Sequence, residues 1–432
     1  MKQISTFKLS AVAAAMTAAV ICSSTAFATN GYFKHGYGQK AEGMGGVGVA
    51  LPQDSIASAT NPAGLAFVGN RADIGMELFN PRRDATLDFS GGAGGAVSAE
   101  SGDTLFLIPE AGFSMDMAGM TMGLAMVANG GMNTRYSTNI FNQAFGIPPG
   151  TYPNTGTLGM NLSQLLILPS VAYKVNDSNA LGASLVVGYQ RFRAYGLGDF
   201  AAFGFSSDPA HFTNKGDDDS WGGGVRLGWT GKVTDTLTLG ATAASKVYMQ
   251  PFSRYKGLFA EKGDFDIPAN FAVGLALKPT QDMTVGFDVE RILYEGVSSV
   301  SNSGPTSTEL FTPPPAAGRQ LGNSGGIGFG WRNMTVYKLG VSYNYSDQWT
   351  LRAGFNYGKT PIPNDQNIFN IIAPGVVEKH LTFGFTFSPS KNNEITMAYM
   401  HAFRKDQSLT TPYRADIGMS QNSVGASYGW KF

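Results

Sequence analysis

The clearest pattern in the chain is Tyr337-Lys-Leu-Gly-Val-Ser-Tyr-Asn-Tyr345, followed by Ser346-Asp347-Gln348 and then by Trp349-Thr-Leu-Arg-Ala-Gly-Phe-Asn-Tyr357. Apolar residues occupy every second position in both halves, and the residues between them are polar or small. Because successive side chains of a β-strand point to opposite faces, this alternation predicts two strands with one apolar face each. The short polar segment that joins them predicts a hairpin turn.

The same alternation recurs from residue 71 to the end of the chain and predicts an all-β fold, a 14-stranded antiparallel transmembrane barrel. Short and long connections alternate between the strands, which is typical of periplasmic turns and external loops. An even number of strands also suits a barrel made from a single chain. The strands are expected at 71–82, 104–117, 120–133, 162–175, 180–195, 219–232, 236–249, 267–279, 282–297, 332–346, 349–359, 378–388, 393–405 and 420–432.

The composition also favours a membrane barrel. Charged residues make up 14% of the chain, well below the ~25% of soluble domains. The net charge is zero, so no charge excess points to nucleic acid. After residue 28 no apolar run is long enough for a membrane helix. In lipid every backbone polar group must be paired within the protein, and a closed barrel is the alternative to helices.

The first residues resemble a secretory signal peptide, which we assign to 1–28. Lys2 and Lys8 give a positive start, an Ala-rich apolar run follows, and Ala26-Phe27-Ala28 matches a signal-peptidase site. A membrane anchor is the alternative interpretation. The single cysteine, Cys22, lies within this segment, so we expect no disulfide in the mature chain.

The last strand ends Val424-Gly-Ala-Ser-Tyr428-Gly-Trp430-Lys-Phe432, with apolar residues on one face. A terminal Phe on such a strand is similar to the signal that the bacterial barrel-insertion machinery reads, although an ordinary amphipathic strand has the same pattern. We therefore expect a multi-pass barrel in the outer membrane of a Gram-negative bacterium. Its expected partners are the insertion machinery through Phe432, membrane lipid and lipopolysaccharide, and we expect a monomer.

Residues 29–70 do not read as strands and are assigned to an N-terminal hatch, and 71–432 to the barrel. The segment is rich in Gly, and Pro62 removes a backbone donor. Irregular backbone at membrane depth survives only inside protein or water, so we expect the hatch to plug the lumen. Gly43-x-Gly45-x-x-Gly48 matches a dinucleotide fingerprint in letters but lacks its βαβ setting, and no cofactor is expected.

The sequence resembles the FadL-type outer-membrane transporters of long-chain fatty acids and related hydrocarbons. The resemblance covers most of the mature chain and is most specific in the hatch, at Gly43–Ala50, Asp54–Ala59 and Asn61-Pro62-Ala63-Gly64-Leu65. It implies a fourteen-stranded barrel with a hatch, in agreement with the strand count made from the pattern. The start at Thr29-Asn30-Gly31-Tyr32-Phe33 departs from the fatty-acid transporters.

Asn129-Gly130-Gly131 interrupts the third expected strand. Glycine inside a strand marks a bulge or a close backbone approach, while simple fraying at the strand end is the alternative. The resemblance implies a kink here that opens the wall beside the hatch and releases the ligand sideways. We expect ligand binding and translocation to involve Tyr32, Phe33, Asn61, Pro62, Ala63, Gly130 and Gly131.

Two long connections carry apolar side chains that would be unusual on a soluble surface. We expect an external groove that captures the ligand, built by Ile140, Phe141, Phe145, Phe200 and Phe203. The alternative is that these residues pack on one another or touch lipopolysaccharide.

The function expected is passive, hatch-gated uptake of hydrophobic molecules, with long-chain fatty acids first. Aromatic or other hydrocarbons, a general porin, an enzyme and an adhesin are the alternatives. The four histidines have no metal-ligand spacing, and no nucleophile motif is present, so neither a metal nor catalytic residues are expected.

Overall fold

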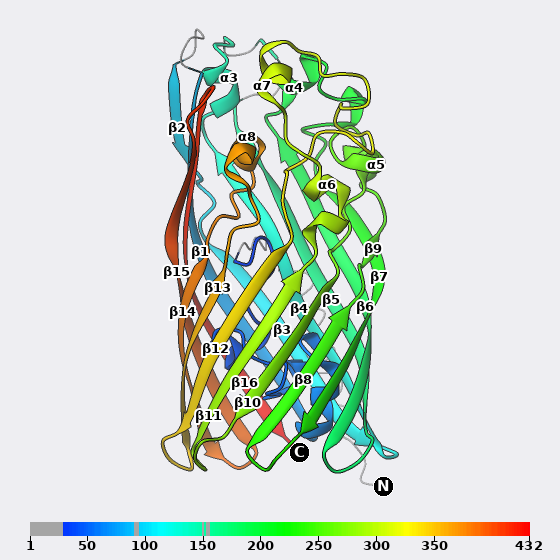
Figure 1. Cartoon of the computed structure of the whole chain (residues 1–432), viewed down its shortest axis with the longest axis vertical. Coiled ribbons are helices and arrows are strands. Elements are labelled where there is room, and N and C mark those ends of the chain that lie inside the picture. The colour runs from blue at the N-terminus through cyan, green and yellow to red at the C-terminus, as the bar shows by residue number, and fades with distance from the viewer. Residues whose placement is uncertain (1–28, 90–94, 149–150, 153–155) are drawn as a thin grey trace.

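The computed structural model describes residues 29–89, 95–148, 151–152 and 156–432. The expected signal peptide, 1–28, lies outside these ranges. The described chain forms a tall barrel with short turns at one end and long, folded loops at the other (Figure 1). No helix among the described residues is long and apolar enough to cross a membrane.

Fourteen long strands form the wall. They are β1 (Arg71–Asp88), β3 (Phe106–Met117), β4 (Met120–Tyr136), β5 (Leu158–Lys174), β6 (Asn179–Tyr195), β7 (Asp218–Lys232), β8 (Leu237–Ala244), β10 (Asn270–Leu277), β11 (Met283–Ile292), β12 (Met334–Asn344), β13 (Trp349–Gly358), β14 (Lys379–Ser390), β15 (Asn393–Leu409) and β16 (Arg414–Lys431). Two short strands, β2 (Ala96–Glu100) and β9 (Tyr248–Met249), pair only with β1 and β7.

The wall closes because β16 pairs with β1 along its whole length, from Arg71 opposite Lys431 to Asp88 opposite Arg414. Every neighbouring pair of long strands is antiparallel. Because β1 and β16 are paired, neither the first nor the last strand is left as an open edge of the sheet. The 14-stranded antiparallel barrel predicted from the alternating pattern is confirmed.

The alternation sorts side chains between lipid and lumen. On β1, Ile74, Met76 and Leu78 are exposed outward, while Glu77 and Phe79 are buried inward. Apolar exposure of this kind continues around the barrel, as on β6 with Leu181 and Leu185. An outward apolar band with inward polar groups is the property of an outer-membrane barrel, and the protein is located in the outer membrane.

Several strand ends differ from the sequence prediction. β1, β15 and β16 reach Asp88, Leu409 and Arg414, beyond the expected 82, 405 and 420. These extensions stand above the apolar band, where outward positions are polar. On β1 and β16 the apolar residues of the alternation, such as Leu87 and Ile417, point inward. An ion pair at 2.8 Å between Arg404 and Asp84 joins β15 to β1 there. β2 lies in a segment predicted as a connection, and β8 ends at Ala244 rather than 249.

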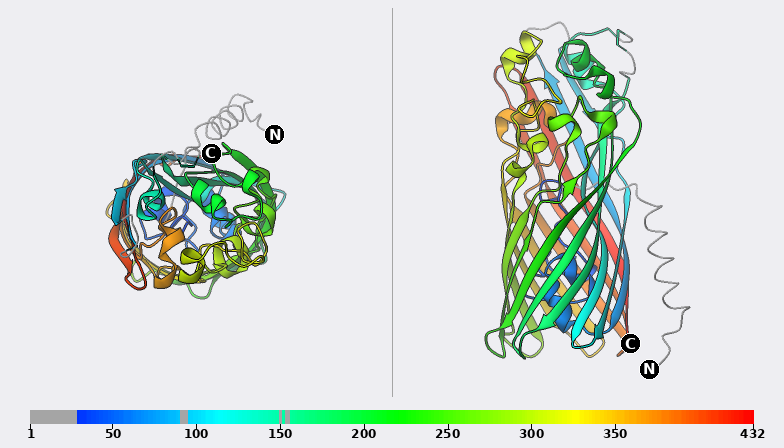
Figure 2. Two further views of the ribbon diagram at one scale, coloured as in Figure 1. Left: turned by 90° about the horizontal axis from the view of Figure 1, so that it is seen from above. Right: turned by 90° about the vertical axis from the view of Figure 1, so that its right-hand side faces the viewer.

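Residues 29–70 lie inside the barrel, mostly in its lower half, where Figure 1 shows them in dark blue and Figure 2 from above and from the side. They form three short helical segments, α2 (Gln39–Glu42), η1 (Ser55–Ala59) and η2 (Pro62–Phe67). The Asp54 and Asn61 side chains cap η1 and η2 by accepting hydrogen bonds from Ile56 N–H and Ala63 N–H. Capping supplies partners to backbone donors that no strand reaches.

Charged groups tie this segment to the inner wall. Lys34 contacts Glu42 and lies 2.8 Å from Glu77 of β1. Glu110 of β3 accepts hydrogen bonds from Gly38 N–H and Gln39 N–H at 3.1 and 3.2 Å. Burial, and next the Glu77 carboxylate, raises the pKa of Glu42 well above its usual range. These contacts place the N-terminal segment against β1 and β3, with its buried charges paired.

A second set of anchors lies toward the short turns. Lys40 and Arg71 both contact Glu394 of β15. Asp288 of β11 accepts hydrogen bonds from Gly48 N–H and Val49 N–H, at 2.8 and 3.0 Å. Burial, together with the Asp73 carboxylate, raises the pKa of Asp54 to about 7.

Glycines of the wall make room for the segment's backbone. A Cβ at Gly354 would lie 2.1 Å from the carbonyl carbon of Met44, and one at Gly240 would lie 2.4 Å from Val49 O. Gly240 pairs with Gly274, and Gly340 with Gly354, so glycines stand side by side in the wall. Part of the high glycine content therefore comes from close backbone contact across the lumen.

The C-terminal Phe432 is 44% exposed, and its N–H donates to Asn70 O at 3.1 Å. Its ring lies 5.0 Å from that of Trp430. The outward position leaves the ring accessible, and recognition by the insertion machinery stays a prediction.

The remaining short helices lie in the connections. They are α3 (Ile140–Ala144), α4 (Gly198–Ala202), η3 (Pro209–His211), η4 (Ser253–Tyr255), α5 (Ala260–Gly263), η5 (Tyr294–Gly296), α6 (Ser298–Ser301), α7 (Ser307–Phe311), η6 (Asn364–Gln366) and α8 (Asn367–Asn370).

The glycine contact can be tested at Gly228 of β7, where a Cβ would lie 1.9 Å from Asn61 Oδ1. We expect Gly228→Ala to displace the 61–63 turn and to lower the free energy of unfolding by about 1–3 kcal/mol, measured by denaturant unfolding in detergent. Gly223→Ala on the same strand is the control, because a Cβ there meets nothing within 4 Å. Equal stability of the two variants would contradict the contact.

Candidate ligand cavity and wall gap

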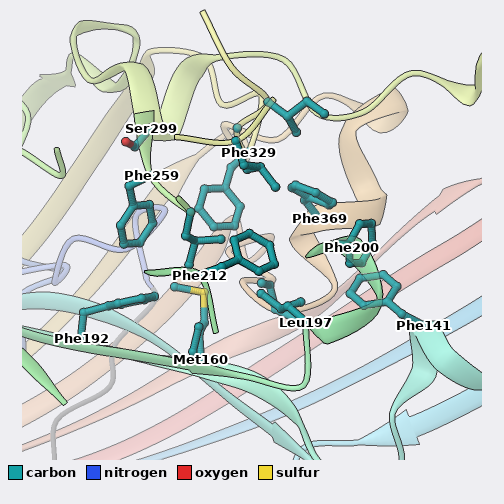
Figure 3. A pocket seen from close by; sticks show the side chains of 16 residues that line it. Phe141, Met160, Phe192, Leu197, Phe200, Phe212, Phe259, Ser299, Phe329 and Phe369 are labelled. Atoms are coloured by element: carbon teal, nitrogen blue, oxygen red, sulfur yellow. The ribbon is translucent and has the colours of Figure 1, made fainter. Parts of the chain in front are cut away.

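The long loops fold over the barrel and enclose an apolar cavity (Figure 3). Met160 reaches it from β5 and Phe192 and Ala194 from β6, and loop residues complete it. Its free volume is about 20 Å³, room for about one water molecule. A ligand must therefore push side chains aside as it enters. The cavity is lined by Phe141, Met160, Phe192, Ala194, Leu197, Phe200, Phe212, Leu258, Phe259, Ser299, Leu321, Ile327, Gly328, Phe329, Phe369 and Ile372.

Two of the five residues expected in a capture groove, Phe141 and Phe200, line this cavity. Ile140 is fully buried, while Phe145 and Phe203 are partly buried and pack against the same core. The Phe145 ring lies 5.9 Å from that of Phe200. The expected open groove is thus a covered cluster, because the loops bury each other's aromatic rings.

A chain of aromatic rings leads from the cavity down to the N-terminal segment. The ring centroids of Phe192 and Phe259 are 4.6 Å apart, those of Phe259 and Phe265 4.8 Å, and those of Phe265 and Tyr32 6.1 Å. Phe33 continues the chain 5.5 Å from Tyr32. These spacings are those of favourable aromatic contacts. Tyr32 and Phe33 therefore lie at the lower end of an apolar path and not in the cavity itself.

Tyr32 is held by partners that the sequence analysis did not single out. Tyr32 N–H donates to Tyr294 Oη at 3.2 Å, and Tyr294 O–H donates to Asn30 O at 2.5 Å. The Trp331 ring packs 5.7 Å from that of Tyr32. These two residues follow β11 and precede β12, where no local pattern distinguished them from other loop aromatics.

The wall is interrupted beside this path. Pairing between β3 and β4 ends at Glu110 opposite Val127, while β4 continues along β5 to Tyr136. The two sides meet again where Gly102 N–H donates to Arg135 O. We call the stretch between residues 103–109 and 128–134 the β3–β4 gap. Pro109, which has no N–H to donate, stands at its lower end.

The N-terminal segment pairs with the edge of β4 that faces this gap. Lys34 N–H donates to Asn129 O at 2.9 Å, and Gly131 N–H donates to Tyr32 O at 3.1 Å. Phe33 and Gly130 form an antiparallel bridge. A Cβ at Gly130 would lie 1.7 Å from Tyr32 O, so this approach requires glycine. The alternative of fraying at the strand end does not fit, because β4 stays paired with β5 beyond the glycines.

Asn129 is a bulge in β4, since the register to β5 shifts between Ala128 and Gly130. Its side chain accepts a hydrogen bond from Tyr37 O–H at 2.8 Å and donates to Gln164 Oε1 at 3.0 Å. Gln164 in turn donates to Gln190 Oε1 at 3.1 Å. The bulge is thus fixed by a satisfied polar chain that also holds the N-terminal segment.

The turn Asn61-Pro62-Ala63 lies elsewhere. The Asn61 side-chain N–H₂ donates to Trp229 O at 2.9 Å and Thr230 Oγ1 at 3.1 Å, near the short turn after β7. A Cβ at Gly182 of β6 would lie 2.2 Å from Ala63 N. The structure brings Tyr32, Phe33, Gly130 and Gly131 together and keeps the 61–63 turn apart from them as an anchor on β6 and β7.

No group of three His, Cys, Asp or Glu side chains suited to a metal ion occurs in the part of the chain that the structure describes.

A closed barrel with an apolar outer band, a filled lumen and a covered external cavity defines a channel of the outer-membrane type. The chain belongs to the outer membrane protein transport protein family (OMPP1/FadL/TodX), whose model matches residues 15–429. The resemblance found in the sequence is therefore confirmed, and the family is one of transport proteins, not of enzymes.

Solved structures with the same fold include the Pseudomonas putida toluene transporter TodX, at 21% identity and a TM-score of 0.66 over 92% of this chain and 99% of that one. A Pseudomonas aeruginosa FadL homologue has a TM-score of 0.69 at 18% identity, over 93% of this chain and 100% of that one. A candidate outer membrane protein of Neisseria meningitidis serogroup B is 24% identical over 244 residues. The matched part is 50% of this chain and 49% of that relative, so the chain spans about half of the relative's length.

The pairing at the gap can be tested at Gly130. We expect Gly130→Ala to detach residues 32–34 from β4, because the new methyl group takes the place of the Tyr32 carbonyl. Amide hydrogen exchange of these residues should quicken by roughly ten-fold or more as local opening becomes easier, measured by mass spectrometry of the folded barrel. Gly123→Ala is the control on the same strand, where the atoms nearest to a Cβ belong to the flexible Leu65 side chain and not to the backbone. Unchanged exchange in Gly130→Ala would refute this pairing as the restraint.

Proposed function

We propose that this barrel mediates passive uptake of hydrophobic small molecules, with long-chain fatty acids as the principal ligands. The observation that carries the proposal is the aromatic path that begins in the covered cavity and ends at the β3–β4 gap. Each buried CH₂ of a ligand gains about 0.8 kcal/mol on leaving water. For an apolar molecule in this path, a return to water is unfavourable, so the molecule can pass directly from the path into lipid.

In this proposal the loop aromatics around Phe141 and Phe200 receive the ligand. Residues 29–37 form the movable part of the hatch, with Tyr32 and Phe33 closing the inner side of the gap. The Gly130-Gly131 edge of β4 supplies the hydrogen bonds that hold the hatch closed. The 61–63 turn keeps the rest of the hatch fixed while the first residues move, so no energy source is needed beyond ligand binding.

Aromatic hydrocarbons are the second candidate ligands. The phenylalanine-rich lining of the cavity suits flat rings, and the solved relatives include transporters of toluene from Pseudomonas putida and Ralstonia pickettii. A general porin is less well supported, because the lumen is filled by residues 29–70 below and by the loops above.

Filling the cavity tests the proposal. Ala194 lines it from β6 and is 1% exposed. We expect Ala194→Trp to reduce cellular uptake of radiolabelled oleate and toluene to the level of cells without the barrel, because the ligand loses its first binding place. Leu185→Trp on the outward face of β6 is the control and should transport normally.

Folding of both variants is checked by the shift of the unheated barrel on electrophoresis. Normal uptake by a folded Ala194→Trp barrel would contradict the proposal that the ligand passes through this cavity. A large, steady single-channel conductance of the unmodified protein would favour the porin instead.

A further inference from the structure

Arg83 of β1 occupies the upper end of the β3–β4 gap. Its side chain faces the lumen and is 4% exposed. Its Nη1 donates to Asn133 O on one side of the gap, and its Nη2 donates to Asp103 O on the other. The guanidinium also lies 5.7 Å from the centre of the Phe106 ring. One cation thus joins both sides of the gap through neutral carbonyl groups.

This buried cation has no carboxylate partner among the residues that the structure describes. The nearby Asp103 carboxylate pairs instead with Arg135, at 2.9 Å. Two buried donors, Arg83 Nε and Asn133 Nδ2, have no acceptor. Buried charges are normally paired, and an unsatisfied buried donor is costly, so the site is suited to an anion.

Arg83 and Asn133 line a small cavity whose other walls include the apolar side chains of Phe79, Met132 and Met419. Its free volume is about 10 Å³, at the lower limit for one water molecule. Ala373-Pro374-Gly375 covers it, and a Cβ at Gly375 would lie 3.4 Å from Gly31 O at the start of the hatch. The first residues of the N-terminal segment thus lie against the cover of this cavity.

The Arg83 site lies at the membrane depth where the polar head of an amphipathic molecule would lie. The outward residues of β1 are apolar up to Leu78 and polar from Asn80 onward, at Asn80, Arg82 and Asp84. Arg83 consequently stands where the lipid band gives way to the headgroup region. The gap lies directly below it, beside the apolar part of the membrane, where a hydrocarbon chain would pass.

We propose that Arg83 and Asn133 bind the carboxylate of a ligand whose hydrocarbon chain passes through the β3–β4 gap, and so favour fatty acids over neutral hydrocarbons. This proposal rests on the lateral route of the proposed function and adds the chemical class that the exit selects. Guanidinium and amide N–H groups together supply the directed donors that a carboxylate accepts.

The test compares palmitate with methyl palmitate, which has the same chain but no charge. Equilibrium binding of each is measured on the purified, folded barrel, and uptake of each in proteoliposomes. We expect the unmodified protein to favour the acid, and Arg83→Gln to reduce that preference by roughly ten-fold or more, as for loss of a hydrogen bond to a charged group. Binding and uptake of the ester should change much less than those of the acid.

Asn133→Ala separates ligand binding from the role of Arg83 in joining the sides of the gap. It removes the free Nδ2 donor and the 3.5 Å contact of Oδ1 with Arg83 Nη1, but keeps the backbone O that Arg83 contacts, so we expect a smaller loss of acid preference, of a few-fold. Arg82→Gln, a neighbouring outward cation, is the matched control and should keep the preference.

Equal loss of acid and ester in Arg83→Gln would mean that Arg83 only braces the gap, and would overturn the carboxylate site. An unmodified protein that handles both compounds equally would overturn it too, while leaving hydrophobic transport intact. Failure of the unmodified protein to bind or carry either compound, or toluene, would reject the proposed function together with the site.

Discussion

The requirement that every backbone N–H and C=O be paired at membrane depth governs this molecule. The strands satisfy one another around the ring, and β16 completes the ring by pairing with β1. β3 and β4 do not pair along their whole length, because their pairing stops at Glu110 and Val127 while β4 continues upward. The chain's own N-terminal segment supplies the missing partners at Asn129 and Gly131.

The pairing of the N-terminal segment with β4, in place of a neighbouring strand, explains how the segment is held. A strand neighbour contributes many hydrogen bonds along its length, whereas residues 32–34 contribute two, so they are the easiest part of the wall to release. The rest of the segment is held by the buried ion pair of Lys40 with Glu394 and by the capped turn at Asn61. Aromatic contacts connect the releasable part to the covered cavity, which gives a ligand in the loops a physical means of acting on the gap.

Much of the fold could be predicted because the apolar residues of a lipid-facing strand recur at every second position of the sequence. The prediction was wrong at β2 and at the upper ends of β1, β15 and β16, which pair above the lipid, where outward residues are polar. Gly130 could be singled out as a close backbone approach, but not its partner Tyr32, which is ninety-eight positions away in a different segment. Arg83 could not be singled out, since it follows Arg82 just beyond the expected end of the first strand at 82. Arginines there are expected to be solvated until the depth of Arg83 and its missing carboxylate are known.

The route through the wall is tested most directly by photolabelling with a diazirine fatty acid carried by the folded barrel in native-like membranes. Mass spectrometry then locates the attached chain. The account predicts labels in the loop cavity and on both sides of the β3–β4 gap, along 104–109 and 128–132. Labels in the cavity and at the periplasmic end, around residues 52–68, with none at the gap, would contradict it.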